Sequence, residues 1–214
     1  MTVQVIYVGF MPTNCYIIYD EQTRQAAVID PGFDSGKIAA SIMGGYTVKM
    51  ILLTHPHYDH FTACEELRQL LGADVYCYGT AVRFIDGSDN TINEIIRRPT
   101  PPVKNPIPLT DGQIIRVGSL EVRVMYTPGH CEGSCCFVAG NAVFTGDCLF
   151  KDSIGRCDLP TGNYGIMLKS LAKLKKLYKA EGDKEVFPGH GDSSRLSYEV
   201  RFNPYIRESD AFIE

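Results

Sequence analysis

Short runs of apolar and β-branched residues, separated by turn residues, dominate the N-terminal part of the chain. Residues 3–10, 14–20 and 25–32 follow this pattern and predict three strands joined by tight connections. Residues 34–43 predict a helix. The apolar run 49–54 predicts a short strand that is buried on both faces. A helix at 63–72 and a strand at 73–78 follow.

The same pattern returns in the C-terminal half of the chain. Residues 111–130, 141–147 and 184–191 contain further strand-like runs. Residues 163–178 predict an amphipathic helix, with an apolar face formed by Met167, Leu171, Leu174 and Tyr178. Its lysines predict a solvated face rather than a binding patch: Lys169, Lys173, Lys175, Lys176 and Lys179.

Residues 88–110 differ from both halves because five of the twelve prolines fall here. This composition predicts an ordered loop with little regular structure. Loops of this length in compact domains are often functional lids, and a plain connector is the alternative.

Strands and helices follow one another without a strict strand–helix–strand alternation. This order favours two sheets packed together with helices outside, an α/β (α+β) class of fold. A length of 214 residues suits a single domain, residues 1–214, that buries a core without disulfides.

Charge and composition exclude several classes of partner. The formal net charge is -4 and no basic face is visible, so nucleic acid and anionic membranes are not expected as partners. No apolar run reaches the ~18 residues of a membrane-spanning helix. The N-terminus lacks the features of a secretory signal, so we expect a cytoplasmic protein with reduced thiols. The eight cysteines form no CxxC pair, which disfavours a structural zinc knuckle.

The histidines carry the strongest chemical signal. All five lie in three short segments that each follow a strand-like run, THPHYDH at 54–60, TPGH at 127–130 and FPGHG at 187–191. A fourth segment, VFTGD at 143–147, presents Asp147 in the same way. A lone histidine or aspartate would be a structural or turn residue. Four metal-competent groups within six residues, at the end of a buried strand, instead predict a metal site.

The spacing within these segments has a physical meaning. Neutral imidazole is the commonest ligand of transition metals, and a carboxylate adds negative charge. In extended chain His55 and His57 lie on the same side, so both can reach one ion. Asp59 and His60 come where the chain turns into the next helix, so they can serve a neighbouring ion. Glycines and prolines beside the ligands allow sharp turns.

The order THPHYDH, TPGH, FTGD, PGHG resembles that of the metallo-β-lactamase-fold hydrolases along essentially the whole chain. Within that superfamily the sequence looks most similar to short glyoxalase II-like (hydroxyacylglutathione hydrolase-like) proteins. The supporting segments are NCYII, VIDPG, SIGRCDLPTGN and YEVRFNPYI. The resemblance implies a four-layer αββα sandwich with the site along one edge of the two sheets.

The resemblance also implies a ligand assignment. One ion would be held by His55, His57 and His130, a second by Asp59, His60 and His190, and Asp147 would bridge them. The implied cofactors are two divalent transition-metal ions, with zinc expected and iron or manganese as alternatives. Asp30 in VIDPG is either a turn residue, the interpretation favoured here, or a carboxylate that orients a ligand histidine.

The reaction implied by the resemblance is hydrolysis of a small-molecule thioester of the hydroxyacylglutathione type. Two ions ~4 Å apart can hold a hydroxide at neutral pH, because metal binding lowers the pKa of water to about 7. Asp59 would orient this metal-bound hydroxide and receive its proton, which makes it the expected catalytic residue. Arg156 either binds a substrate carboxylate or pairs with Asp158.

The sequence leaves two further points open. Only 23 residues follow Gly191, so the C-terminal helical domain of full-length glyoxalase II is not expected. Cys131, Cys148 and Cys157 replace small residues of the relatives and are interpreted as packing residues.

An alternative use of the same ligands is a mononuclear iron persulfide dioxygenase, similar to this chain around THPHYDH and GRCD. His55, His130 and Asp147 would then hold a single ferrous ion. A binding domain without activity, a true β-lactamase and an RNA-cleaving enzyme are less favoured. Oligomeric state is not predicted.

Overall fold

The structure, a computed structural model, describes residues 1–94 and 100–212. The strands form two six-stranded sheets. The first sheet contains, in spatial order, β1 (Thr2–Val8), β2 (Thr13–Asp20), β3 (Gln25–Ile29), β4 (Thr47–Leu53), β5 (Asp74–Tyr78) and β6 (Ile107–Leu109). The second sheet contains β12 (Ser194–Arg195), β11 (Glu185–Pro188), β10 (Ala142–Gly146), β9 (Cys135–Ala139), β8 (Leu120–Tyr126) and β7 (Ile114–Val117).

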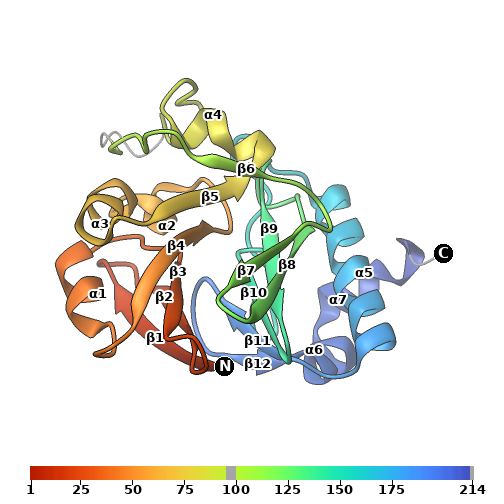
Figure 1. The fold of residues 1–214 in the computed structure, drawn as a ribbon. Coiled ribbons are helices and arrows are strands. Elements are labelled where there is room, and N and C mark those ends of the chain that lie inside the picture. Colours follow the sequence, from red (N-terminus) through yellow and green to blue (C-terminus); the bar gives the residue numbers. More distant parts are fainter. Residues whose placement is uncertain (95–99, 213–214) are drawn as a thin grey trace.

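Helices cover the outer face of each sheet (Figure 1). The first sheet carries α1 (Ser35–Ser41), α2 (Tyr58–Phe61) and α3 (Cys64–Leu71), and α4 (Val82–Ile85) lies beyond β5 after a single 3-10 turn, η1 (Gly79–Ala81). The second sheet carries α5 (Tyr164–Glu181), α6 (Leu196–Phe202), α7 (Pro204–Glu208) and the terminal 3-10 helix η3 (Ser209–Phe212). The predicted αββα sandwich is confirmed.

Three layers of apolar side chains lie between the two sheets and the two layers of helices and hold them together. In β2, Ile17 faces the helices of the first sheet and Ile18 faces the second sheet, because successive side chains of a strand point to opposite faces. Phe137 and Phe144 meet Ile18 in the layer between the sheets. A third layer lies between the second sheet and α5. The end of β4 is therefore buried on both faces, as its apolar run predicts: Ile51 and Leu53 pack against the helices and Leu52 packs between the sheets.

Strand direction brings the future site residues to one edge. Strands β3, β4, β5 and β6 run parallel to one another, and β10 and β11 are parallel in the other sheet. The carboxyl ends of parallel strands meet at the same edge of a sheet. The segments that follow β3, β4, β10 and β11 consequently gather at one edge of the sandwich.

Two predictions of local structure need correction. Lys175 of α5 is buried and pairs with Asp210 of η3, because the C-terminal helices cover this side of α5. The proline-rich segment 88–110 contains a strand, β6, which adds a parallel edge to β5. Residues 95–99 of that segment, which include Pro99, lie outside the described residues.

No described helix is long and apolar enough to cross a membrane.

Candidate metal centre

Seven predicted ligands meet at this edge, and each comes from a segment that follows a strand. The turn after β4 supplies His55 and His57, and α2 supplies Asp59 and His60. The other three follow β8, β10 and β11, in this order: His130, Asp147 and His190. The two sheets thus contribute to one site from opposite sides.

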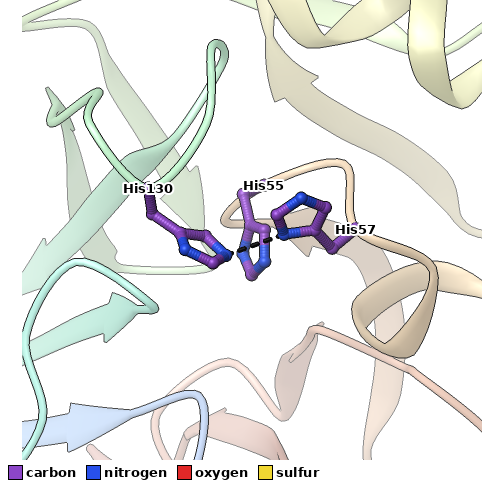
Figure 2. Close-up of side chains that lie close together, drawn as sticks. All are labelled: His55, His57 and His130. Atoms are coloured by element: carbon purple, nitrogen blue, oxygen red, sulfur yellow. Dashed lines mark hydrogen bonds between the residues drawn. The ribbon is translucent and has the colours of Figure 1, made fainter. Parts of the chain in front are cut away.

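The first trio consists of His55, His57 and His130. Figure 2 shows that the three imidazoles point toward one another from two separate loops. His57 Nδ1 lies 2.7 Å from His130 Nε2, and all three rings are buried. One nitrogen of each ring lies within 4.8 Å of the other two, a grouping that can hold one metal ion.

The second trio consists of Asp59, His60 and His190. His190 Nε2 lies 3.3 Å from His60 Nε2 and 3.3 Å from Asp59 Oδ2. Their ligand atoms also fall within 4.8 Å of one another. One carboxylate and two imidazoles form a second grouping that can hold an ion.

Asp147 lies between the two trios. Its Oδ2 is 3.5 Å from His130 Nε2 of the first trio and 3.7 Å from His190 Nε2 of the second. Its Oδ1 is 3.4 Å from His60 Nε2. The predicted ligand set is therefore brought together completely, and Asp147 is the member that reaches both trios.

A buried carboxylate orients one histidine of each trio. Asp30 Oδ2 lies 2.9 Å from His60 Nδ1 and accepts a 2.6 Å hydrogen bond from Thr54 Oγ1. Thr54 Oγ1 in turn lies 3.0 Å from His55 Nδ1. Since an ionised carboxylate only accepts, Asp30 fixes the proton of His60 on Nδ1, and the hydroxyl of Thr54 is left to accept from His55. With the proton of each ring on Nδ1, Nε2 is the nitrogen that faces the site and that an ion would bind.

Backbone carbonyls orient two more histidines in the same way. His130 Nδ1 lies 2.7 Å from the carbonyl oxygen of Arg156, and His190 Nδ1 lies 3.0 Å from that of Pro12. A carbonyl only accepts, so both protons are on Nδ1 and both Nε2 atoms are free to bind an ion. His57 differs, because its Nδ1 is the atom that faces the first trio.

Burial and neighbouring charges set the protonation of these groups. Burial, with the neighbouring histidines, holds the pKa of His55 far below its usual value, and burial lowers that of His57 to about 3. Burial also opposes a charge on His60, but Asp147, Asp59 and Asp30 together raise its pKa to about 10. In the metal-free protein His60 is therefore a cation among carboxylates, and an ion that binds there must displace its proton.

The backbone approaches the ligands so closely that two positions require glycine. A Cβ atom on Gly189 would lie 2.3 Å from Asp147 Oδ1 and 2.6 Å from His60 Cε1. A Cβ atom on Gly32 would lie 1.7 Å from the carbonyl oxygen of Asp59. These two glycines let the loops pack against the ligand-bearing segments.

Buried polar atoms without a partner show that the residues fit a metal. Among the described residues, His55 Nε2, His57 Nε2 and Asp147 Oδ1 are buried and make no hydrogen bond. Unpartnered buried polar atoms cost about 1–3 kcal/mol each. Two of these three are ligand atoms of the predicted centre, and five imidazoles with two carboxylates form a donor set typical of zinc, iron or manganese.

The other candidate residues, Arg156 and three cysteines, do not belong to either trio. The guanidinium of Arg156 makes two 2.7 Å hydrogen bonds to Asp158, and both side chains are mostly exposed. The loop-ordering alternative is thus the one observed, although Arg156 lies close enough to contribute to the lowered pKa of His57. Cys131 and Cys148 are buried packing residues, and Cys157 is half-buried.

Sequence reasoning missed two contributions. The sequence favours a turn role for Asp30, which has a φ of 53°, but its carboxylate also orients His60. No sequence pattern singles out Thr54, although it directly precedes His55 and links it to Asp30. The only sequence signal is position, since each residue directly follows a strand that leads into the site.

A family model and several named relatives match the sequence. A family model described as "Metallo-beta-lactamase superfamily" matches residues 8–190. The hydroxyacylglutathione hydrolase GloC of Haemophilus influenzae is 29% identical over 213 residues, covering 96% of this chain and 98% of that protein. The probable polyketide biosynthesis zinc-dependent hydrolase BaeB of Bacillus velezensis is 30% identical over 177 residues, covering 82% and 72%.

Three solved structures are similar along nearly the whole chain. BLEG-1, a B3 metallo-beta-lactamase, has a TM-score of 0.86 at 29% identity, covering 96% of this chain and 99% of that one. TTHA1623, solved in a di-iron-bound form, has a TM-score of 0.80 at 32% identity, covering 94% and 99%. ETHE1 from Myxococcus xanthus has a TM-score of 0.75 at 28% identity, covering 100% and 88%.

The link through Thr54 generates a prediction. Thr54→Val keeps the shape of the side chain but removes the hydroxyl between Asp30 and His55. We expect metal affinity to fall by about 10–100-fold, the usual cost of losing a partner that orients a ligand. Chelator competition measures this change. Thr23→Val is the matched control, because Thr23 Oγ1 donates a 2.6 Å hydrogen bond to Asp20 at the opposite end of β3. Equal metal affinity in the two variants would contradict the orienting role.

Proposed function

The chain belongs to the metallo-beta-lactamase superfamily and is a metal-dependent hydrolase, and from this premise we propose that it hydrolyses a small-molecule thioester of the hydroxyacylglutathione type. In this proposal the first and second trios would each hold one divalent transition-metal ion, zinc by expectation, and Asp147 would serve both. Neither nucleic acid nor a membrane is a partner.

The observation that carries the proposal is the pairing of two complete trios around one carboxylate. Three nitrogens form the first group, a carboxylate and two nitrogens form the second, and Asp147 lies within 3.7 Å of ligand nitrogens in both. Seven ligands exceed what one tetrahedral ion uses. A pair of ions explains why all seven side chains point to one place.

The two metal ions, when bound, supply Lewis acidity and lower the pKa of a bound water so that it is a nucleophile at neutral pH. The residues of this chain supply orientation and charge. Burial favours the neutral form of Asp59, but His60 and His190 outweigh it and hold its pKa well below the usual range. Asp59 is therefore a carboxylate at neutral pH, able to accept a hydrogen bond from the attacking water and to orient it.

Two considerations support a thioester as the substrate. A thiolate leaves readily, so the reaction needs no strong acid to protonate the leaving group. The relative GloC, which aligns over nearly its full length, is named a hydroxyacylglutathione hydrolase. Arg156, at the rim of the first trio, is the proposed binding group for a substrate carboxylate. Its pair with Asp158 is exposed to solvent and therefore contributes little, so a substrate can compete for the guanidinium.

A mononuclear iron dioxygenase is the second candidate function. It would use His55, His130 and Asp147 alone. The 2.7 Å approach of His57 Nδ1 to His130 Nε2 disfavours it, because His57 then lies against the ion without binding it.

Two assays on the metal-loaded protein test the proposal against this alternative. One follows hydrolysis of a 2-hydroxyacyl thioester of glutathione, and the other follows oxygen consumption with a glutathione persulfide. We expect hydrolysis and no oxygen uptake with zinc-loaded protein. Oxygen uptake by the iron-loaded protein, with no thioester hydrolysis by either form, would replace the proposal with the alternative.

Ligand variants should separate the two ions. Asp147→Asn removes charge from the group that reaches both trios, so we expect both ions to bind more weakly and kcat/KM to fall by more than about 100-fold. His190→Ala should chiefly weaken the second ion. Metal content after dialysis measures both effects, and Asp74→Asn on β5 is the matched control for loss of charge. Full metal content and a near-normal rate in Asp147→Asn would remove Asp147 from the centre.

Arg156→Ala tests substrate capture. A contact made equally in the ground and transition states changes KM more than kcat. We expect KM for a carboxylate-bearing thioester to rise about 10-fold, consistent with loss of one charge-assisted hydrogen bond, and KM for a neutral thioester to stay unchanged. Arg116→Ala, an equally exposed arginine on β7 paired with Glu121, is the control. Equal losses on both substrates would mean that Arg156 only orders its loop.

A further inference from the structure

The segment that follows β10 is a closed loop with both of its ends in the metal centre. Asp147 stands at one end, and Arg156, whose carbonyl accepts from His130 Nδ1, stands at the other. The amide of Gly155 donates a 3.1 Å hydrogen bond to the carbonyl oxygen of Asp147 and closes the loop. A Cβ atom on Gly155 would lie 2.0 Å from that oxygen, so the two ends are packed against each other. We call residues 147–156 the bridging loop.

The far end of the bridging loop is held by the C-terminal helices. Phe150 and Ser153 pair through two backbone hydrogen bonds of 3.0 and 3.3 Å. Asn203 Nδ2 donates to the carbonyl oxygens of both residues, at 3.4 and 3.1 Å. The Oδ1 atom of Asn203 faces the other way and accepts from the first turn of α7. One side chain therefore links the start of α7 to the turn of the bridging loop.

A buried carboxylate completes this anchor. Glu199 of α6 is fully buried, and its Oε2 accepts from the amide of Asp152 at 3.0 Å and from Asn203 Nδ2 at 2.9 Å. Its Oε1 accepts from the hydroxyl of Ser194. No ion pair involves Glu199 within residues 1–94 and 100–212. A buried carboxylate with neutral donors alone is costly unless each oxygen is well hydrogen-bonded, so this arrangement specifies one position for the loop.

We infer that Asn203 and Glu199 are positioning residues of the metal centre. They act through the bridging loop, whose two ends supply the carboxylate that reaches both trios and the carbonyl that fixes the tautomer of His130. Neither residue touches the ligands. Sub-ångström displacement of the loop would move Asp147 and the acceptor of His130 together. The inference rests on one part of the proposed function, that the two trios and Asp147 bind metal.

Asn203→Ser tests the inference and separates it from helix capping. Serine is as good an N-cap as asparagine, so α7 stays capped, but its hydroxyl is too short to reach the loop carbonyls as well. Asn163→Ser is the matched control, because Asn163 caps α5 through a 2.9 Å bond from the amide of Ile166. The readouts are Co²⁺ affinity by chelator competition, thermal stability, kcat and KM.

We expect Asn203→Ser to weaken Co²⁺ binding about 10–100-fold and to lower kcat with little change in KM. Asn163→Ser should leave Co²⁺ affinity unchanged. Unchanged Co²⁺ affinity in Asn203→Ser, or equal weakening in both variants, would overturn the inference. Co²⁺ affinity is measured without substrate, so a protein that binds metal through this anchor but cleaves no thioester would contradict the proposed function alone.

A second pair of variants covers the carboxylate. Glu199→Gln keeps one oxygen that can accept from the amide of Asp152, whereas Glu199→Ala removes it. We expect Co²⁺ affinity in Glu199→Gln to lie closer to that of the natural protein than in Glu199→Ala. Equal Co²⁺ affinity in these two variants would overturn the role of Glu199.

Discussion

The hydrogen bonds that converge on the carboxylate of Asp30 are the constraint on which the centre depends. Its Oδ2 atom accepts a hydrogen bond from His60 Nδ1 and another from the hydroxyl of Thr54. That hydroxyl in turn accepts from His55 Nδ1. The two imidazoles belong to different trios, so a single buried carboxylate sets the tautomer of one ligand for each ion. The left-handed backbone at Asp30 allows the chain to end β3 and turn its carboxylate back beneath the ligands. A change at Asp30 would therefore disturb both ions at once.

The two sheets supply the rest of the centre from opposite sides, and two of the ligands are oriented by contacts that are distant in the chain. His130 depends on a carbonyl in the bridging loop, and His190 depends on the carbonyl of Pro12 between β1 and β2. The loop that carries His190 is held in turn by Asn14 and Tyr16, which donate to the carbonyl oxygen of Pro188. The metal centre is thus one place where polar contacts join the two halves of the sandwich, in addition to the apolar layer that joins them by packing.

The sequence predicts the architecture that the structure shows and the seven side chains that the fold brings together, because both leave local patterns. Alternating and all-apolar runs predict the strands, and THPHYDH concentrates four ligands within one short turn. The orienting residues leave no such pattern. Thr54 and Asp30 are 24 residues apart, and Asn203 is 50 residues from the carbonyl of Ser153, so only the folded chain reveals these bonds. The burial of Lys175 was missed for the same reason: the helices that cover it are separate in the sequence. The sequence allows Arg156 either to bind a substrate carboxylate or to pair with Asp158, and in the structure it pairs with Asp158, two residues away.

The central claim is that the seven ligands hold two ions in each chain, and metal stoichiometry tests it most directly. Protein stripped of metal, titrated with Zn²⁺ and then freed of weakly bound ions should retain two equivalents per chain. Saturation at one equivalent with excess metal would contradict the account, because one trio would then be arranged without an ion to bind.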